Sequence, residues 1–210
     1  MHQQWRNTKT EIQDSAFLKI EKLHPYKMIL FLSMVGSSLI FMFMALAFWA
    51  NSIDSETTQQ FKLPKIFTLG IIILILSSFS ISKALSFFQA DNARSLFYSL
   101  LITLGLGLFF ALCQFIGWKQ LDDLGIYPSG HSSRTYLYII SGLQLIHLLG
   151  CLIFLVMALS RAWLAKQDPV KNLMIVTDSR NKIKLEILTS YWHFLDISWV
   201  VLFLFFLFIF

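Results

Sequence analysis

Two stretches of this chain, residues 95–118 and 135–160, contain no Lys, Arg, Asp or Glu. A helix needs roughly 20 mainly apolar residues to cross a bilayer, so each stretch is long enough to span one. Over the whole chain 56% of the residues are hydrophobic and 14% are charged, whereas soluble domains average roughly 45–50% and 25%. The sequence therefore predicts a membrane protein and excludes both a soluble globule and a disordered chain.

Three further stretches are apolar over a similar length. Residues 28–50 are uncharged, residues 66–88 contain one charge at Lys83, and residues 187–210 contain one acid at Asp196. We therefore expect an all-α, multi-pass membrane protein with five transmembrane helices. The predicted spans are 28–50, 66–88, 95–118, 135–160 and 187–210.

The distribution of basic residues predicts the orientation of these helices. Of the 17 Lys and Arg residues, the outer loops of an arrangement with the N-terminus inside would hold only Lys62, Lys65, Lys119 and Arg134. Because basic residues are retained on the cytoplasmic side of short loops, we expect the N-terminus inside and the C-terminus outside. The net charge of +5 then reflects orientation, and the scatter of its residues indicates no nucleic-acid partner.

The N-terminal segment, residues 1–27, is polar and mixed in charge. It does not resemble a secretory signal, so the first transmembrane helix is expected to direct its own insertion. We expect this segment to be cytoplasmic, with a short interfacial helix over residues 5–22. Residues 28–210 would form the membrane domain.

Residues that commonly hold metals or cofactors are sparse. Cys113 and Cys151 both fall inside predicted spans, where cysteine behaves as a small apolar residue. Disulfide scaffolds and zinc sites need more cysteines or a tighter spacing of cysteines with histidines, so we expect no metal and no cofactor in this chain. Gly107 and Ala111 lie in the middle of a span and predict a close contact between helices.

Ionisable groups at membrane depth are costly and usually face a protein interior. Glu186, His193 and Asp196 are spaced so that they lie on one stripe of the fifth helix, and the fourth helix carries Gln144 and His147. One interpretation is a buried network that fixes helix packing, in which Asp196 is hydrogen-bonded to His193 one turn away. The other is a proton relay along the stripe. A haem held by the two histidines is disfavoured, because their predicted depths differ by roughly 10 Å.

The fifth helix also carries a specific motif. It reads Glu186, four residues, then Tyr191-Trp192-His193-Phe194-Leu195-Asp196, with Trp199 three residues on. This resembles the last helix of subunit III of haem-copper oxidases, whose signature has Tyr-Trp-His-Phe-Val-Asp at these positions. Three more motifs resemble the family in the family's order: Leu63-Pro64 with Ser77-Ser78, Leu106-Gly107-x-x-Phe110-x-x-x-Gln114, and Gly142-x-Gln144-x-x-His147-x-x-Gly150.

The resemblance implies the short five-helix bacterial form of cytochrome c oxidase subunit III. Such a chain is a non-catalytic subunit in the bacterial inner membrane that packs on the catalytic subunit I and other oxidase subunits of the respiratory electron transport chain. Haem and copper are then expected in subunit I, whereas this chain binds phospholipid and supports proton uptake and complex stability in aerobic respiration. Membership of a respiratory supercomplex stays open.

Site residues follow from the same motifs. The structural or proton-relay candidates are Glu186, His193, Asp196, His147, Gln114 and Gln144. The candidates for lipid or partner contacts are Tyr191, Trp192, Trp199, Gly107, Gly142 and Gly150.

The chain also departs from the family pattern. The first two of the family's seven helices are missing, Val35 stands where the family frequently has an intramembrane Glu, Gln144 replaces a histidine, and Gly117 replaces a Glu. These changes remove titratable groups, which favours an assembly role over a catalytic or proton-channel role.

Alternatives remain from the sequence alone. The equivalent subunit of a quinol oxidase or a nitric oxide reductase would carry the same motifs. A stand-alone small transporter or proton-conducting protein is the rival class, although the sequence has neither inverted repeats nor broken helices to support it.

Overall fold

A computed structural model describes residues 25–53, 64–125 and 133–209, and all elements in these residues are helices. They are α2 (Pro25–Ile53), α3 (Lys65–Gln89), α4 (Ala93–Asp123), α5 (Ser133–Gln167), α6 (Pro169–Thr177) and α7 (Ser179–Ile209). The predicted interfacial helix over residues 5–22 lies outside the described residues. The chain divides into two units, residues 1–36 and residues 37–210, and α2 crosses the boundary between them.

The five predicted spans are confirmed as helices that are long and apolar enough to cross a membrane. These are Pro25–Asn51, Lys65–Gln89, Ala93–Asp123, Thr135–Gln167 and Arg180–Phe208. Several run beyond the predicted bounds, because apolarity ends at the membrane surface whereas hydrogen bonding continues through Lys119, Lys166 and Lys182, which are good helix formers.

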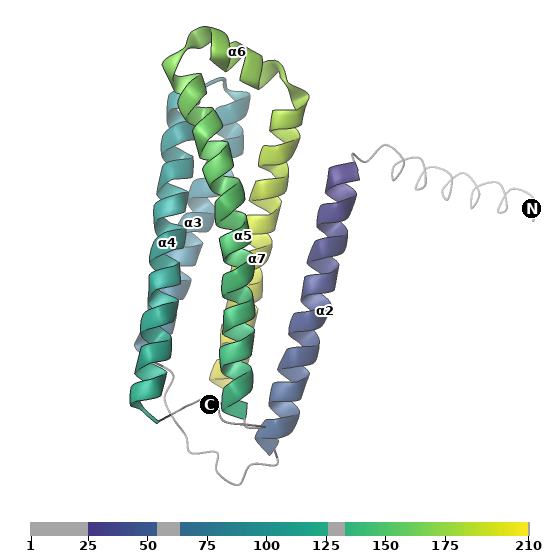
Figure 1. The fold of residues 1–210 in the computed structure, drawn as a ribbon, viewed down its shortest axis with the longest axis vertical. Coiled ribbons are helices and arrows are strands. Elements are labelled where there is room, and N and C mark those ends of the chain that lie inside the picture. The colour runs from purple at the N-terminus through teal and green to yellow at the C-terminus, as the bar shows by residue number, and fades with distance from the viewer. Residues whose placement is uncertain (1–24, 54–63, 126–132, 210) are drawn as a thin grey trace, which may run out of the picture. The chain divides into compact units, whose positions relative to one another are not determined.

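Four long helices of the second unit, α3, α4, α5 and α7, lie side by side in Figure 1. The short helix α6 connects α5 to α7 across one end of this bundle (Figure 1). The part of α2 that belongs to this unit packs through Phe48, whose ring meets Phe205 and Phe206 of α7 at centroid distances of 5.9 and 5.3 Å. Burial of these large rings contributes apolar contact between α2 and α7.

Asparagine and aspartate residues set the breaks between the helices. Asn92 accepts a hydrogen bond from the backbone N–H of Ser95 at 3.0 Å and so caps α4. Asp168 caps α6 in the same way, directly before a proline that is well suited to a first helical turn. Asp178 accepts from the backbone N–H of Arg180 at the start of α7.

Asp178 lies outside the membrane-spanning segments. The backbone N–H of Arg180 and its guanidinium both donate to the carboxylate, which lowers the pKa of Asp178. The carboxylate is therefore ionised at neutral pH, and a negative charge at a helix N-terminus is favourable.

Candidate functional site

The polar side chains of the bundle gather along the seam between α3 and α7, and His193 is their centre. The Ser78 hydroxyl lies 2.7 Å from Nδ1 of His193, and the Ser82 hydroxyl lies 3.1 Å from Nε2. Ser82 donates its single proton to the Ser78 carbonyl at 2.8 Å. Nε2 must therefore carry the proton that Ser82 accepts, and in the neutral imidazole Nδ1 then accepts from Ser78.

Trp192 ties the seam to the neighbouring helices. Its indole Nε1 donates to the Ser77 hydroxyl at 3.1 Å, and Ser77 in turn donates to the Leu74 carbonyl at 2.7 Å. The far edge of the indole lies against Gly107 of α4, where an added methyl group would meet Trp192 at 2.9 Å and Leu152 of α5 at 3.0 Å. The close helix contact predicted at Gly107 is therefore present, and it involves α4, α5 and α7.

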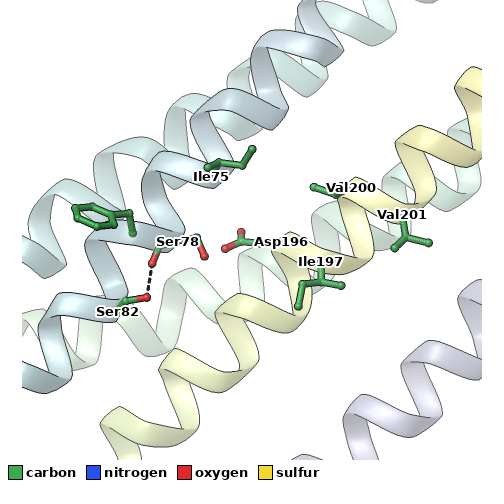
Figure 2. A pocket seen from close by; sticks show the side chains of 8 residues that line it. Ile75, Ser78, Ser82, Asp196, Ile197, Val200 and Val201 are labelled. Carbon is green, nitrogen blue, oxygen red and sulfur yellow. Dashed lines mark hydrogen bonds between the residues drawn. The ribbon is translucent and has the colours of Figure 1, made fainter.

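Asp196 lies one turn beyond Trp192 on α7. It is 7% exposed, and neither carboxylate oxygen has a hydrogen-bond partner among the described residues. Figure 2 shows the Asp196 carboxyl and the Ser78 side chain pointing toward each other between the two helices. The expected hydrogen bond from His193 to Asp196 is wrong, because the imidazole directs both nitrogens to the α3 serines.

The polar residues of α5 form separate contacts. Gln144 donates from Nε2 to the Leu195 carbonyl of α7 at 3.0 Å, so this amide joins α5 to α7. His147 donates from Nδ1 to the Leu143 carbonyl at 2.8 Å, and its Nε2 then accepts from the Ser37 hydroxyl of α2 at 3.1 Å. The structure therefore places the two transmembrane histidines in different hydrogen-bond networks.

The remaining relay candidates are Glu186 and Gln114. Glu186 lies on α7 two turns before His193 and is partly exposed. Gln114 is buried in α4, and its side-chain amide has no hydrogen-bond partner among the described residues. Together with His193 and Asp196, these residues form no group of three metal-ligating side chains within the described segments.

Two of the residues expected to face lipid or a partner face the interior instead. Trp192 is 1% and Trp199 is 2% exposed, and the Trp199 ring packs edge-on against Phe110 of α4 at 5.7 Å. Large aromatic residues near helix ends are often interfacial, but here the glycine at position 107 leaves room for an indole inside the bundle. Tyr191 is partly exposed and lies beside Phe194.

Gly142 and Gly150 were expected at contacts as well. The nearest atoms to a methyl group at Gly142 belong to Trp118 at 4.0 Å, and at Gly150 no atom lies within 4 Å. Neither glycine is therefore required for a close approach among the residues that the structure describes.

Sequence reasoning missed the serines as site residues. The sequence motifs include Ser77 and Ser78 but do not assign them to the site, and they do not include Ser82. The spacing of Ser78 and Ser82 by four residues, opposite a transmembrane histidine, was the available signal, because side chains at this spacing lie on one face of a helix.

Comparison with known proteins identifies the family. The sequence matches the family model described as cytochrome c oxidase subunit III over residues 4–210. The chain belongs to this family. It is thus a subunit III of a haem-copper oxidase and a multi-pass membrane protein, and it associates with other oxidase subunits.

Two relatives extend the comparison. The probable quinol oxidase subunit 3 of Staphylococcus aureus (strain USA300) is 28% identical over 150 residues, which is 70% of this chain and 68% of that protein. The cytochrome bo(3) ubiquinol oxidase subunit 3 of Buchnera aphidicola subsp. Schizaphis graminum is 30% identical over 147 residues, which is 69% of this chain and 71% of that protein. Both relatives are named for oxidases that use a quinol.

Proposed function

We propose that this subunit III belongs to a quinol-oxidising haem-copper oxidase of a bacterial inner membrane. The names of the two relatives support a quinol as the electron donor, in place of the cytochrome c that the sequence motifs first suggested. In this proposal the chain packs on the catalytic subunit, stabilises the complex and sustains its proton uptake, while haem and copper are held by the partner.

The observation that carries an assembly role is the use of polar groups inside the bundle. His193, His147, Gln144 and Trp192 each form a hydrogen bond to another helix of the same chain. Both nitrogens of each transmembrane histidine are engaged in hydrogen bonds, so neither offers a free ligand for a metal. Such groups brace the helices against one another, which suits a rigid scaffold.

The outer surface supports the same role. On α2, large apolar side chains are exposed along residues 37–51, including Phe43, Leu46 and Trp49. In a membrane this surface is covered by lipid chains or by other transmembrane helices. We propose that phospholipids and the neighbouring oxidase subunits share it.

The proposal is tested by purifying an affinity-tagged form of this chain in mild detergent. The preparation should contain a haem-bearing catalytic subunit and should reduce dioxygen with a quinol as donor. Reduction with cytochrome c but not with quinol would overturn the assignment of the donor. Recovery of this chain alone, with proton flux in liposomes, would overturn the assembly role.

A proton-relay role is a second candidate, and the position of Ser78 favours it. When His193 takes up a proton at Nδ1, this nitrogen becomes a donor and the Ser78 hydroxyl is released to donate to the Asp196 carboxylate. Ser78→Ala would remove this link, whereas Ser78→Thr would keep the hydroxyl. Slower proton uptake in an intact complex with alanine but not with threonine would support the relay, and equal rates would exclude it.

A further inference from the structure

An open groove follows the seam between α3 and α7, with a volume of about 440 Å³ (Figure 2). Most of its lining residues are apolar, and of the polar ones only Asp196 is buried. The lining consists of Ile75, Ser78, Phe79, Ser82, Asp196, Ile197, Val200 and Val201. Ile197 and Val201 are 64% and 59% exposed, so the groove opens to the outside of this chain.

Asp196, the acid that lines the groove, has no hydrogen-bond partner among the described residues. Ser78 faces Asp196 but lies within hydrogen-bond distance of His193. Ser82 is hydrogen-bonded to His193 and to the backbone carbonyl of Ser78. Burial of a carboxyl group without a hydrogen bond is costly, by several kcal/mol for an ionised group. The groove is therefore complementary to an occupant that brings a hydrogen-bond donor or a cation.

The depth of Asp196 restricts that occupant. The span of α7 runs from Arg180 to Phe208, which places Asp196 about 24 Å from one end and about 18 Å from the other at 1.5 Å per residue. This is near the middle of the bilayer, far from phospholipid headgroups. A lipid acyl chain could fill the apolar part, but it carries no donor for the carboxyl.

A transmembrane helix meets all three requirements. Its side chains are apolar enough to pack between two helices, it passes through the middle of the bilayer, and it can carry an amide, indole, hydroxyl or basic group at that depth. Polar side chains that bond across helices stabilise association in membranes. A ridge of such a helix also fits the depression that two packed helices leave between them.

We propose that the α3–α7 groove receives a transmembrane helix of another oxidase subunit, which places a hydrogen-bond donor or a cation against Asp196. This inference rests on the proposed function, because it requires that the chain is assembled with partner subunits. It adds the face through which one partner binds and the residue that the partner must satisfy.

The test uses the purified complex with the photoreactive residue p-benzoylphenylalanine at position 197 or 201. Irradiation should cross-link the chain to one other oxidase subunit, which mass spectrometry of the product identifies. The same probe in place of Ile153 is the control, because this α5 residue is 63% exposed but lies outside the groove. Equal cross-linking of the same subunit from Ile153 would overturn the assignment of this face.

Other products overturn the proposal while leaving the proposed function intact. They are a cross-link only to lipid, only to a quinone, only within this chain or to a second copy of it, or no cross-link although the oxidase subunits co-purify. Recovery of the chain without any oxidase subunit would remove both the proposed function and the inference.

Substitutions provide an independent measurement. Asp196→Leu should weaken retention of the partner subunit about 3- to 30-fold in a detergent titration, the range for polar contacts between membrane helices. Because this change at a buried position also affects folding, Val201→Trp is the second variant, since it fills the groove from an exposed position. It should weaken retention too, whereas Ile153→Trp should not, and equal retention in Val201→Trp and the parent would overturn the proposal.

Discussion

Gly107→Ala is the substitution whose effect the structure specifies most closely. The added methyl group would lie 2.9 Å from Cη2 of Trp192 and 3.0 Å from Cδ2 of Leu152, which is closer than carbon atoms normally approach. The indole has little freedom to move away, because it is buried and donates to Ser77 on a third helix. Gly105, two residues earlier on the same helix, has no atom of the described residues within 4 Å of its methyl position and supplies a matched control.

The magnitude follows from the difference between the two alanine variants. Replacement of a glycine by alanine inside a helix favours the helix by roughly 0.5–1 kcal/mol, and this gain is shared by both variants. Overpacking of a filled interior costs about 1–3 kcal/mol, and only Gly107→Ala incurs it. The free energy of unfolding of Gly107→Ala should therefore be lower than that of Gly105→Ala by about 1–3 kcal/mol.

Titration with SDS of the protein in mild detergent, followed by intrinsic fluorescence, measures both unfolding free energies. The same pair made in a Trp192→Phe background provides the second half of a double-mutant cycle, because phenylalanine lacks the indole edge that meets the methyl group. In that background the difference should shrink to less than about 1 kcal/mol. Equal stabilities of Gly105→Ala and Gly107→Ala, or a difference unchanged by Trp192→Phe, would refute the reasoning.

Three further outcomes are expected. Ser82→Ala should lower the free energy of unfolding by about 1 kcal/mol, because Nε2–H of His193 loses its acceptor, and an unchanged SDS titration would contradict the assigned proton position. Trp192→Phe by itself should lower the free energy of unfolding by about 1–3 kcal/mol in the same titration. The change removes the hydrogen bond that the indole donates to Ser77 and leaves a void beside the smaller ring. The lowered pKa of Asp178 means that its capping of α7 is present above the usual carboxyl pKa and is lost as the pH falls through the lower folded-state value. The protection of the Arg180 amide against exchange, measured relative to the intrinsic exchange rate at each pH, should therefore fall on acidification in the parent but vary less with pH in Asp178→Asn, and an equal loss of protection in both would contradict the cap.

The helices of this protein could be predicted from the sequence because apolarity over about 20 residues is a physical requirement of the bilayer. The same criterion could not place their ends. Charged residues such as Lys166 leave the membrane while the helix continues, and at this position the ammonium group lies over the rings of Phe97, Tyr98 and Trp163. These aromatic contacts therefore stabilise the charged last turn of α5, which composition alone assigns to a loop.

The candidate site was predicted only in part. The stripe of His193 and Asp196 on one face of α7 follows from helical periodicity, and the structure has both residues on the side of α3. Their expected mutual hydrogen bond fails because Ser78 and Ser82 of α3 engage both nitrogens of the imidazole. Which residues α3 presents at that height depends on the vertical register of two helices, which the sequence of one helix does not contain.

Burial of the tryptophans could not be predicted for a related reason. Position along a helix suggests the depth of a side chain in the membrane but not the direction in which it points. The direction of Trp192 is set by an absence of side-chain volume on another helix, at Gly107. A contact of this kind needs both helices, and it becomes visible only when they are packed.

The indole of Trp192 also fixes the rotation of α7 about its own axis. It is held by Ser77 on α3 and enclosed by Gly107 on α4, so α7 cannot turn about its own axis without withdrawing the ring from both. Neighbouring residues are about 100° apart around the helix axis, so a rotation of that size would put a different residue in the position of Trp192. Since Asp196 lies one turn further along α7, the contacts of the ring that oppose this rotation also fix the direction in which the buried carboxyl points.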